Sequence, residues 1–176
     1  MNWKTPMLVG AVIAAVSFAE AKTAYVSSDG NDSTGEVDNP DLPFATLKTA
    51  LTKLTTGDVL QLKDGTLTLT ETFTLNKAVT VQGNPNDRRA AVINVNSTSE
   101  KPYRGIYINT KYACVRDLTV SNAVISGGNE YGGGIRVDGG YSAVSNCVIT
   151  CCRKEVSPGG GGAALSLQGQ ERIDGV

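Results

Sequence analysis

The sequence contains no histidine among its 176 residues and only four cysteines. A metal site of mixed cysteine and histidine ligands is therefore excluded, and the cysteines include no C-x-x-C pair of the kind that binds zinc. The formal net charge of −1 lacks the basic surplus with which general nucleic-acid-binding proteins displace counterions from phosphates. These absences exclude a histidine-based metal centre and general nucleic-acid binding.

Long hydrophobic runs are missing beyond the N-terminus. The run from Met7 to Phe18 follows Lys4 and is too short to span about 30 Å of hydrocarbon. Because the small residues Ala19 and Ala21 suit a signal peptidase, we predict a signal peptide over residues 1–21; an uncleaved anchor is the alternative. The remaining chain is then expected to have no transmembrane segment and to be secreted, on the cell surface or in the periplasm.

The cysteines would lie in a compartment that permits disulfides. They are Cys114, Cys147, Cys151 and Cys152. Cys147 falls on a position that we predict to face inward, so a small buried thiol is one interpretation and a disulfide is the other.

What the sequence does contain is an internal repeat without gaps, which we call the echo. The segment GIYINTKYACVRDLTVSNA at positions 105–123 recurs as GIRVDGGYSAVSNCVITCC at positions 134–152. A short repeat made of strand-type residues is typical of stacked coils, and a fixed repeat length is not expected of an antiparallel sandwich. The spacing to the next equivalent residue, from Ile135 to Leu165, is one residue longer than that between the two repeated segments. We therefore predict an all-β fold, a single-stranded right-handed parallel β-helix (a solenoid).

Short alternating runs support this winding from residue 59 onward. We predict strands at residues 59–62, 66–69, 73–75, 79–82, 91–95, 105–108, 115–120, 134–137, 144–149 and 163–167. Before them, Phe44, Leu47, Ala50, Leu51 and Leu54 have helical spacing, which predicts a short N-terminal helix that caps the first coil. Residues 22–58 would form a strand, an acidic loop and this helix, and residues 59–176 would form coils that are incomplete at the C-terminus.

The chain resembles, from about Tyr25 to Leu167, the N-terminal region and first coils of right-handed parallel β-helix proteins of the pectin-lyase-like superfamily. The resemblance lies in a P-F-A-T helix start at residues 43–46, a G-D to G-T strand pair at residues 57–66, and an N-C-x-I phrase at residues 146–149. It implies a β-helix and an association with polysaccharides. It implies no particular reaction.

Enzymes of that superfamily act mostly by calcium-assisted lysis with an Arg or Lys base, or by hydrolysis with paired aspartates. No such set can be assigned in this sequence. We therefore predict a secreted or surface protein that binds or displays glycans without catalysis. One alternative is a polysaccharide lyase or glycoside hydrolase of the superfamily; if the chain is an enzyme, we expect a lyase. The other is an N-terminal fragment of a larger adhesin-like protein with further coils.

The repeat itself suggests one surface cluster. If the isoleucines and valines at residues 106, 108, 135 and 137 point inward, Tyr107 and Arg136 stack outward on adjacent coils, with Asn109 beside Asp138. An aromatic ring, a guanidinium and a carboxylate are groups that hold sugars. The alternative is an ordinary cation–π ladder worth about 0.5–1 kcal/mol.

The acidic segment of residues 28–41, SDGNDSTGEVDNPD, offers oxygen ligands of the type that calcium prefers. It does not fit an EF-hand loop, since Thr34 stands where glycine is required and Pro40 where glutamate is required. A non-standard calcium site and a solvated acidic turn remain the two interpretations. We predict no other cofactor.

Overall fold

The computed structural model describes residues 20–127, 131–155 and 162–168. The predicted signal peptide lies outside these ranges apart from its last two residues. None of the helical structure in the described ranges is long and apolar enough to cross a membrane.

The described strands form three stacked sheets and a small fourth one, and their ladder pairings are all parallel. Sheet A contains β1 (Thr23–Val26), β2 (Val59–Leu62), β5 (Thr80–Gln82), β8 (Cys114–Arg116) and β12 (Ala143–Ser145). Sheet B contains β3 (Gly65–Thr68), β6 (Ala91–Asn94), β9 (Thr119–Ser121) and β13 (Val148–Thr150). Sheet C contains β4 (Phe73–Leu75), β7 (Ile106–Ile108), β11 (Ile135–Val137) and β15 (Leu165–Leu167), and sheet D contains β10 (Val124–Ser126) and β14 (Arg153–Glu155).

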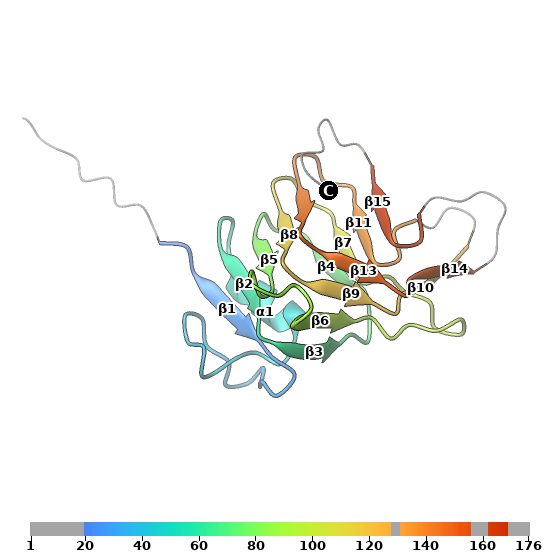
Figure 1. Ribbon diagram of the computed structural model, residues 1–176. Coiled ribbons are helices and arrows are strands. Elements are labelled where there is room, and N and C mark those ends of the chain that lie inside the picture. Colours follow the sequence, from blue (N-terminus) through green and yellow to red (C-terminus); the bar gives the residue numbers. More distant parts are fainter. Residues whose placement is uncertain (1–19, 128–130, 156–161, 169–176) are drawn as a thin grey trace, which may run out of the picture.

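From β2 onward the chain passes through sheets A, B and C in turn and then returns to A one layer further on; in the later coils a strand of sheet D, β10 or β14, lies between those of B and C. Figure 1 shows this winding from β1 at one end to β15 at the other. Because each strand pairs with the equivalent strand of the neighbouring coil, about 4.8 Å away, residues of the same position stack on one another. The predicted parallel β-helix is confirmed.

The strand register confirms the echo. Ile135 pairs with Ile106 of the preceding coil and with Leu165 of the following coil, as the repeat predicts. The identical glycines that open the repeat have a steric reason, because a Cβ atom on Gly105 would lie 2.6 Å from the carbonyl oxygen of Gly134. The earlier coils differ in length: Ile106 pairs with Phe73, which is a longer step along the chain than that from Ile106 to Ile135.

Two of the predicted strands are each two strands in the structure. Residues 115–120 and 144–149 are each divided, between sheets A and B, by a residue in the left-handed region: Asp117 with φ 60° and Asn146 with φ 46°. Asparagine and aspartate tolerate this conformation better than other side chains. The amide of Asn146 also donates to the carboxylate of Asp117 at 2.8 Å, so the two corners stack.

Sheet D was not predicted. Val124 and Ile125 in β10 are both buried, so the strand shows no alternation, and its partner β14 reads Arg-Lys-Glu, which is unlike a strand.

The capping helix α1 (Leu47–Lys53) is shorter than predicted, because Thr46 caps its N-terminus by accepting a hydrogen bond from the Thr49 backbone. Phe44, which we had placed on the helix, instead forms a parallel bridge with Val26. Its ring is nevertheless buried.

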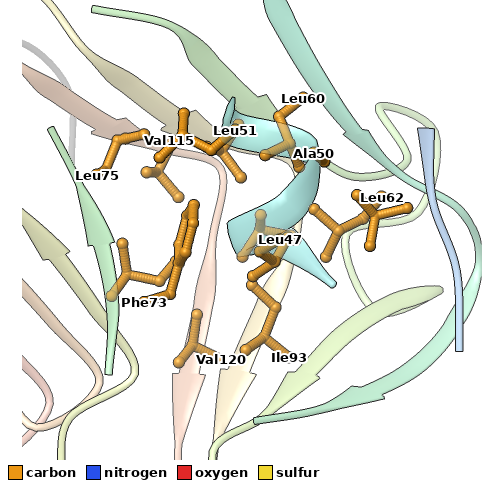
Figure 2. Close-up of a cluster of buried hydrophobic side chains, with 14 of the residues drawn as sticks. Leu47, Ala50, Leu51, Leu60, Leu62, Phe73, Leu75, Ile93, Val115 and Val120 are labelled. Atoms are coloured by element: carbon orange, nitrogen blue, oxygen red, sulfur yellow. The ribbon is translucent and has the colours of Figure 1, made fainter. Parts of the chain in front are cut away.

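Helix α1 closes the N-terminal end of the coil interior. Its buried face packs against β1, β2 and β4, and Figure 2 shows Leu47, Ala50 and Leu51 among side chains that the coils point inward. At the C-terminal end of α1, the Lys77 ammonium donates to the carbonyl oxygens of Leu51 and Leu54, at 2.8 and 2.7 Å. The core of stacked aliphatic side chains and its helical cap both agree with the sequence prediction.

Candidate functional site

The four predicted contact residues lie together on the outer face of sheet C. Arg136 is paired with Tyr107 across β11 and β7, and Asn109 and Asp138 follow directly after these strands. Asn109 is exposed, whereas the other three are half-buried. The two neighbouring coils extend the face with polar side chains, Thr74 on β4 and Ser166 on β15.

Asp138 is the centre of a hydrogen-bonded cluster. Its carboxylate accepts from the hydroxyl of Tyr107 at 2.9 Å and from the guanidinium of Arg136 at 2.9 and 3.0 Å. Arg136 also lies over the ring of Tyr107, with its central carbon 5.6 Å from the ring centroid. The side chains of Arg136 and Asp138 are only 20% and 22% exposed, so each orients the other.

Arg104 joins this cluster, although the sequence pattern did not single it out. Its guanidinium carbon lies 5.8 Å from the centroid of the Tyr107 ring. Arg104 lies before β7, so the alternation of side chains along the strand does not predict which way it points. It also lies just before the part of the sequence that repeats. Only the folded corner brings it to Tyr107.

The electrostatics of the cluster keep each group in its ordinary charge state at neutral pH. Burial raises the pKa of Asp138, but the hydrogen bonds from Arg136 and Tyr107 outweigh it and leave that pKa below its usual value. The hydrogen bond to Asp138 raises the pKa of Tyr107, and the same carboxylate raises the pKa of Arg136. Burial and the neighbouring Arg136 lower the pKa of Arg104.

Two hollows lie elsewhere, near the N-terminal coil. A groove of about 580 Å³ runs between α1 and the β3–β4 corner, and an ion pair between Lys48 and Glu71, 2.8 Å long and exposed, lies along it. A second hollow of about 600 Å³ lies between the acidic loop and sheet A, where it is lined by Gln61 and Asn84 among others. Neither is lined by the four predicted contact residues.

Several carboxylates of the acidic segment accept hydrogen bonds from protein groups. Asp32 accepts from the backbone N–H groups of Ala45 and Thr46 and from the hydroxyls of Thr46 and Thr49. Asp38 accepts from the backbone of Thr23 at 2.6 Å. In the described part of the chain, no three acidic or cysteine side chains gather closely enough to hold a metal ion.

All four cysteines are free thiols. Cys147, one coil after the fully buried Leu118, packs against the core as the inward interpretation predicted. Its burial raises the pKa of the thiol to about 11.

No protein-family model matches the chain, and no curated protein is similar enough to count as a relative. Among solved structures, a rhamnogalacturonan lyase is similar with a TM-score of 0.46 and 18% sequence identity, over 73% of this chain and 37% of the lyase. The chain thus spans well under half the length of that enzyme. A similarity of this size does not indicate a shared activity.

Proposed function

We propose that this chain is a glycan-binding β-helix of the pectin-lyase-like superfamily, which holds a polysaccharide against the outer face of sheet C. The observation that carries the proposal is the pre-ordered Tyr107–Asp138–Arg136 cluster. Planar charged groups whose orientation is already fixed lose little entropy when they hydrogen-bond sugar hydroxyls. The adjoining Asn109 adds an exposed amide to the same face.

The charge states of the cluster favour binding over catalysis. A general acid needs a carboxyl with a raised pKa and a general base needs a group that releases its proton near neutral pH. Asp138 has a lowered pKa and Tyr107 a raised one, so neither suits these roles. Asp138 remains an ionised acceptor and Arg136 remains a donor.

The test compares two arginines that lie on outer faces of the coils. Arg136→Gln, alone and with Tyr107→Phe, should weaken polysaccharide binding about tenfold or more, the size expected for lost charged hydrogen bonds. Arg116→Gln, on sheet A, is the matched control and should bind as the wild type does. Binding is measured by calorimetry against a panel of neutral glycans and uronans. Equal affinities for the two variants, or a wild-type protein that binds no member of the panel, would contradict the proposal.

A second candidate function is polysaccharide lysis, because the resemblance implies an Arg or Lys base and Arg104 adjoins the cluster, its guanidinium carbon 5.8 Å from the centroid of the Tyr107 ring. A lyase removes the proton beside a uronate carboxylate while the glycosidic oxygen leaves, and its base must give up its own proton first. An ultraviolet assay for the unsaturated product on pectin and related uronans tests this activity. Product formed by the wild type and not by Arg104→Gln would favour lysis, and absence of product with the wild type would refute it.

We further propose that the protein is exported, on the basis of the run from Met7 to Phe18 and the small residues after it. N-terminal sequencing of exported protein should begin at Lys22. A sequence that begins at Met1 would contradict cleavage.

A further inference from the structure

Two tyrosines project into solvent at the corner between sheets C and A. Tyr112 is 67% exposed and Tyr141 is 51% exposed, which is unusual for such large rings. They occupy the same place on consecutive coils, between β7 and β8 and between β11 and β12. Their rings are stacked, with centroids 5.4 Å apart and planes 12° from parallel.

The backbone at both positions is in the left-handed region, with φ 60° at Tyr112 and 58° at Tyr141. Bulky residues rarely adopt this conformation. The other non-glycine residues with positive φ in the described ranges are aspartates, asparagines and Cys151, which are smaller. An asparagine would form either corner at lower cost, so the turn itself does not account for the two tyrosines.

Core packing does not account for them either, because both rings are more than half exposed and lie outside the core. Tyr103 differs, since its ring packs on the core. The tyrosine pair also does not continue onto the preceding coil. Because Thr80 pairs with Cys114, the residue below Tyr112 is Ala78.

We infer that Tyr112 and Tyr141 form an aromatic platform on which the pyranose rings of a β-linked hexose chain stack. This inference rests on the proposed function and names the class of glycan. Pyranoses whose hydroxyls are equatorial present a face of C–H bonds, which packs against an aromatic ring while the hydroxyls at the rim stay hydrogen-bonded. Exposed rings that cost backbone strain are typical of ligand contacts.

The surroundings of the platform supply the polar half of such a site. Asn109 and Asp138 lie three residues before Tyr112 and Tyr141 at the ends of β7 and β11, and Lys111 is exposed beside Tyr112. The platform therefore continues the polar face of sheet C around the corner. A chain bound there would contact hydrogen-bonding groups on one side of the corner and aromatic rings on the other.

The decisive variants replace the rings without disturbing the corners. The double variant Tyr112→Asn/Tyr141→Asn keeps side chains suited to positive φ, so it should melt no lower than the wild type and should bind cellohexaose at least tenfold more weakly. The double variant Tyr112→Phe/Tyr141→Phe keeps the rings and should retain binding. Leu42→Ala, which shortens an exposed apolar side chain distant in sequence, is the control and should bind normally.

A second readout reports direct contact. Tetranitromethane should nitrate the exposed Tyr112 and Tyr141 in the free protein, and a saturating glycan should slow their nitration, with the sites located by mass spectrometry. Unchanged binding by the double asparagine variant, or nitration that bound glycan does not slow, would overturn the inference. If Arg136→Gln loses binding while the double asparagine variant keeps it, the inference fails and the proposed function stands. If the wild type binds no glycan, both fail.

Discussion

Single residues in the left-handed region set the corners at which each coil turns. Asn122, with φ 58°, stacks on the previous coil by donating from its amide to the side-chain oxygen of Asn94 at 2.9 Å. Cys151, with φ 53°, occupies the equivalent place one coil later, where an exposed thiol offers no such bond. The ladder of corner amides thus has no member at Cys151.

An asparagine at position 151 should stabilise the fold. Cys151→Asn is expected to raise the free energy of unfolding by about 0.5–1.5 kcal/mol, because asparagine tolerates positive φ and extends the amide ladder. Urea denaturation measures the change. Cys152→Asn is the control and should destabilise, since Cys152 packs against the core; a gain from Cys152→Asn and none from Cys151→Asn would refute the ladder argument.

Thiol reactivity should follow burial. Only about one in a thousand Cys147 thiols is ionised at pH 8 when its pKa is about 11, and the thiolate is the nucleophile. Iodoacetamide should therefore modify the exposed Cys151 first and Cys147 very slowly until urea unfolds the chain. Peptide mapping over time distinguishes the two sites, and equal rates in the folded protein would contradict the inward position of Cys147.

The Asp138 cluster should make stability depend on pH in a defined direction. The pKa of Asp138 is lowered in the folded protein, so its contribution to stability is present above the unfolded-state pKa of about 3.9 and is lost as the pH falls below it. Asp138→Asn should therefore cost about 1–3 kcal/mol at pH 7 and less at pH 3 or below. Urea unfolding of both proteins at each pH measures this, and a difference that does not shrink on acidification would contradict the ionic role.

At the scale of elements, the sequence predicted the type of helix α1 and missed its start. Helical spacing from Phe44 to Leu54 is a real pattern, but Phe44 is buried from an extended segment. The start is set by the Thr46 cap, and Asp32, 14 residues before Thr46, holds that cap through a contact that no local pattern contains. Sheet D was missed for a related reason. The residues of β14 do not favour a strand by themselves, and the segment is a strand because it pairs with β10 of the preceding coil.

Removing the anchor of α1 should loosen the cap. Asp32→Ala leaves the backbone N–H groups of Ala45 and Thr46 without their carboxylate, so we expect a loss of about 1.5–3 kcal/mol in unfolding free energy. Asp41→Ala, an exposed acid in the same loop, is the control and should change stability by less than about 0.5 kcal/mol. Similar losses in both variants would show that the loop charge, rather than the anchor, matters.

At the scale of the whole molecule, the echo predicted the winding because the later coils have nearly constant length. The register between β7, β11 and β15 advances from Ile106 to Ile135 and then to Leu165, so equivalent side chains recur in the sequence at almost equal steps. The first coils are irregular, and their stacking could be inferred only from strand composition. The candidate site was predictable to the same extent. The repeat predicted four of its residues, Tyr107, Asn109, Arg136 and Asp138, and did not predict Arg104, which lies outside it.

A coil that contacts only its neighbours should be transferable. Inserting a second copy of residues 105–133 after Gly133 should give a folded protein longer by about 4.8 Å, because the copy of β7 meets β7 below it and β11 above it. Small-angle scattering and thermal unfolding test this. A copy shortened by two residues in the β7–β8 corner is the control; if both insertions unfold alike, the coils are not independent units.

Helix α1 covers the N-terminal end of this stack, so a coil can be inserted away from that end without disturbing the helix. A gene that duplicates one coil in frame therefore replaces the contacts between two coils with equivalent ones and lengthens the outer face of sheet C by one more row. In such a protein, length can change by recombination alone, and the size of the ligand that it accommodates can change in steps of a single coil.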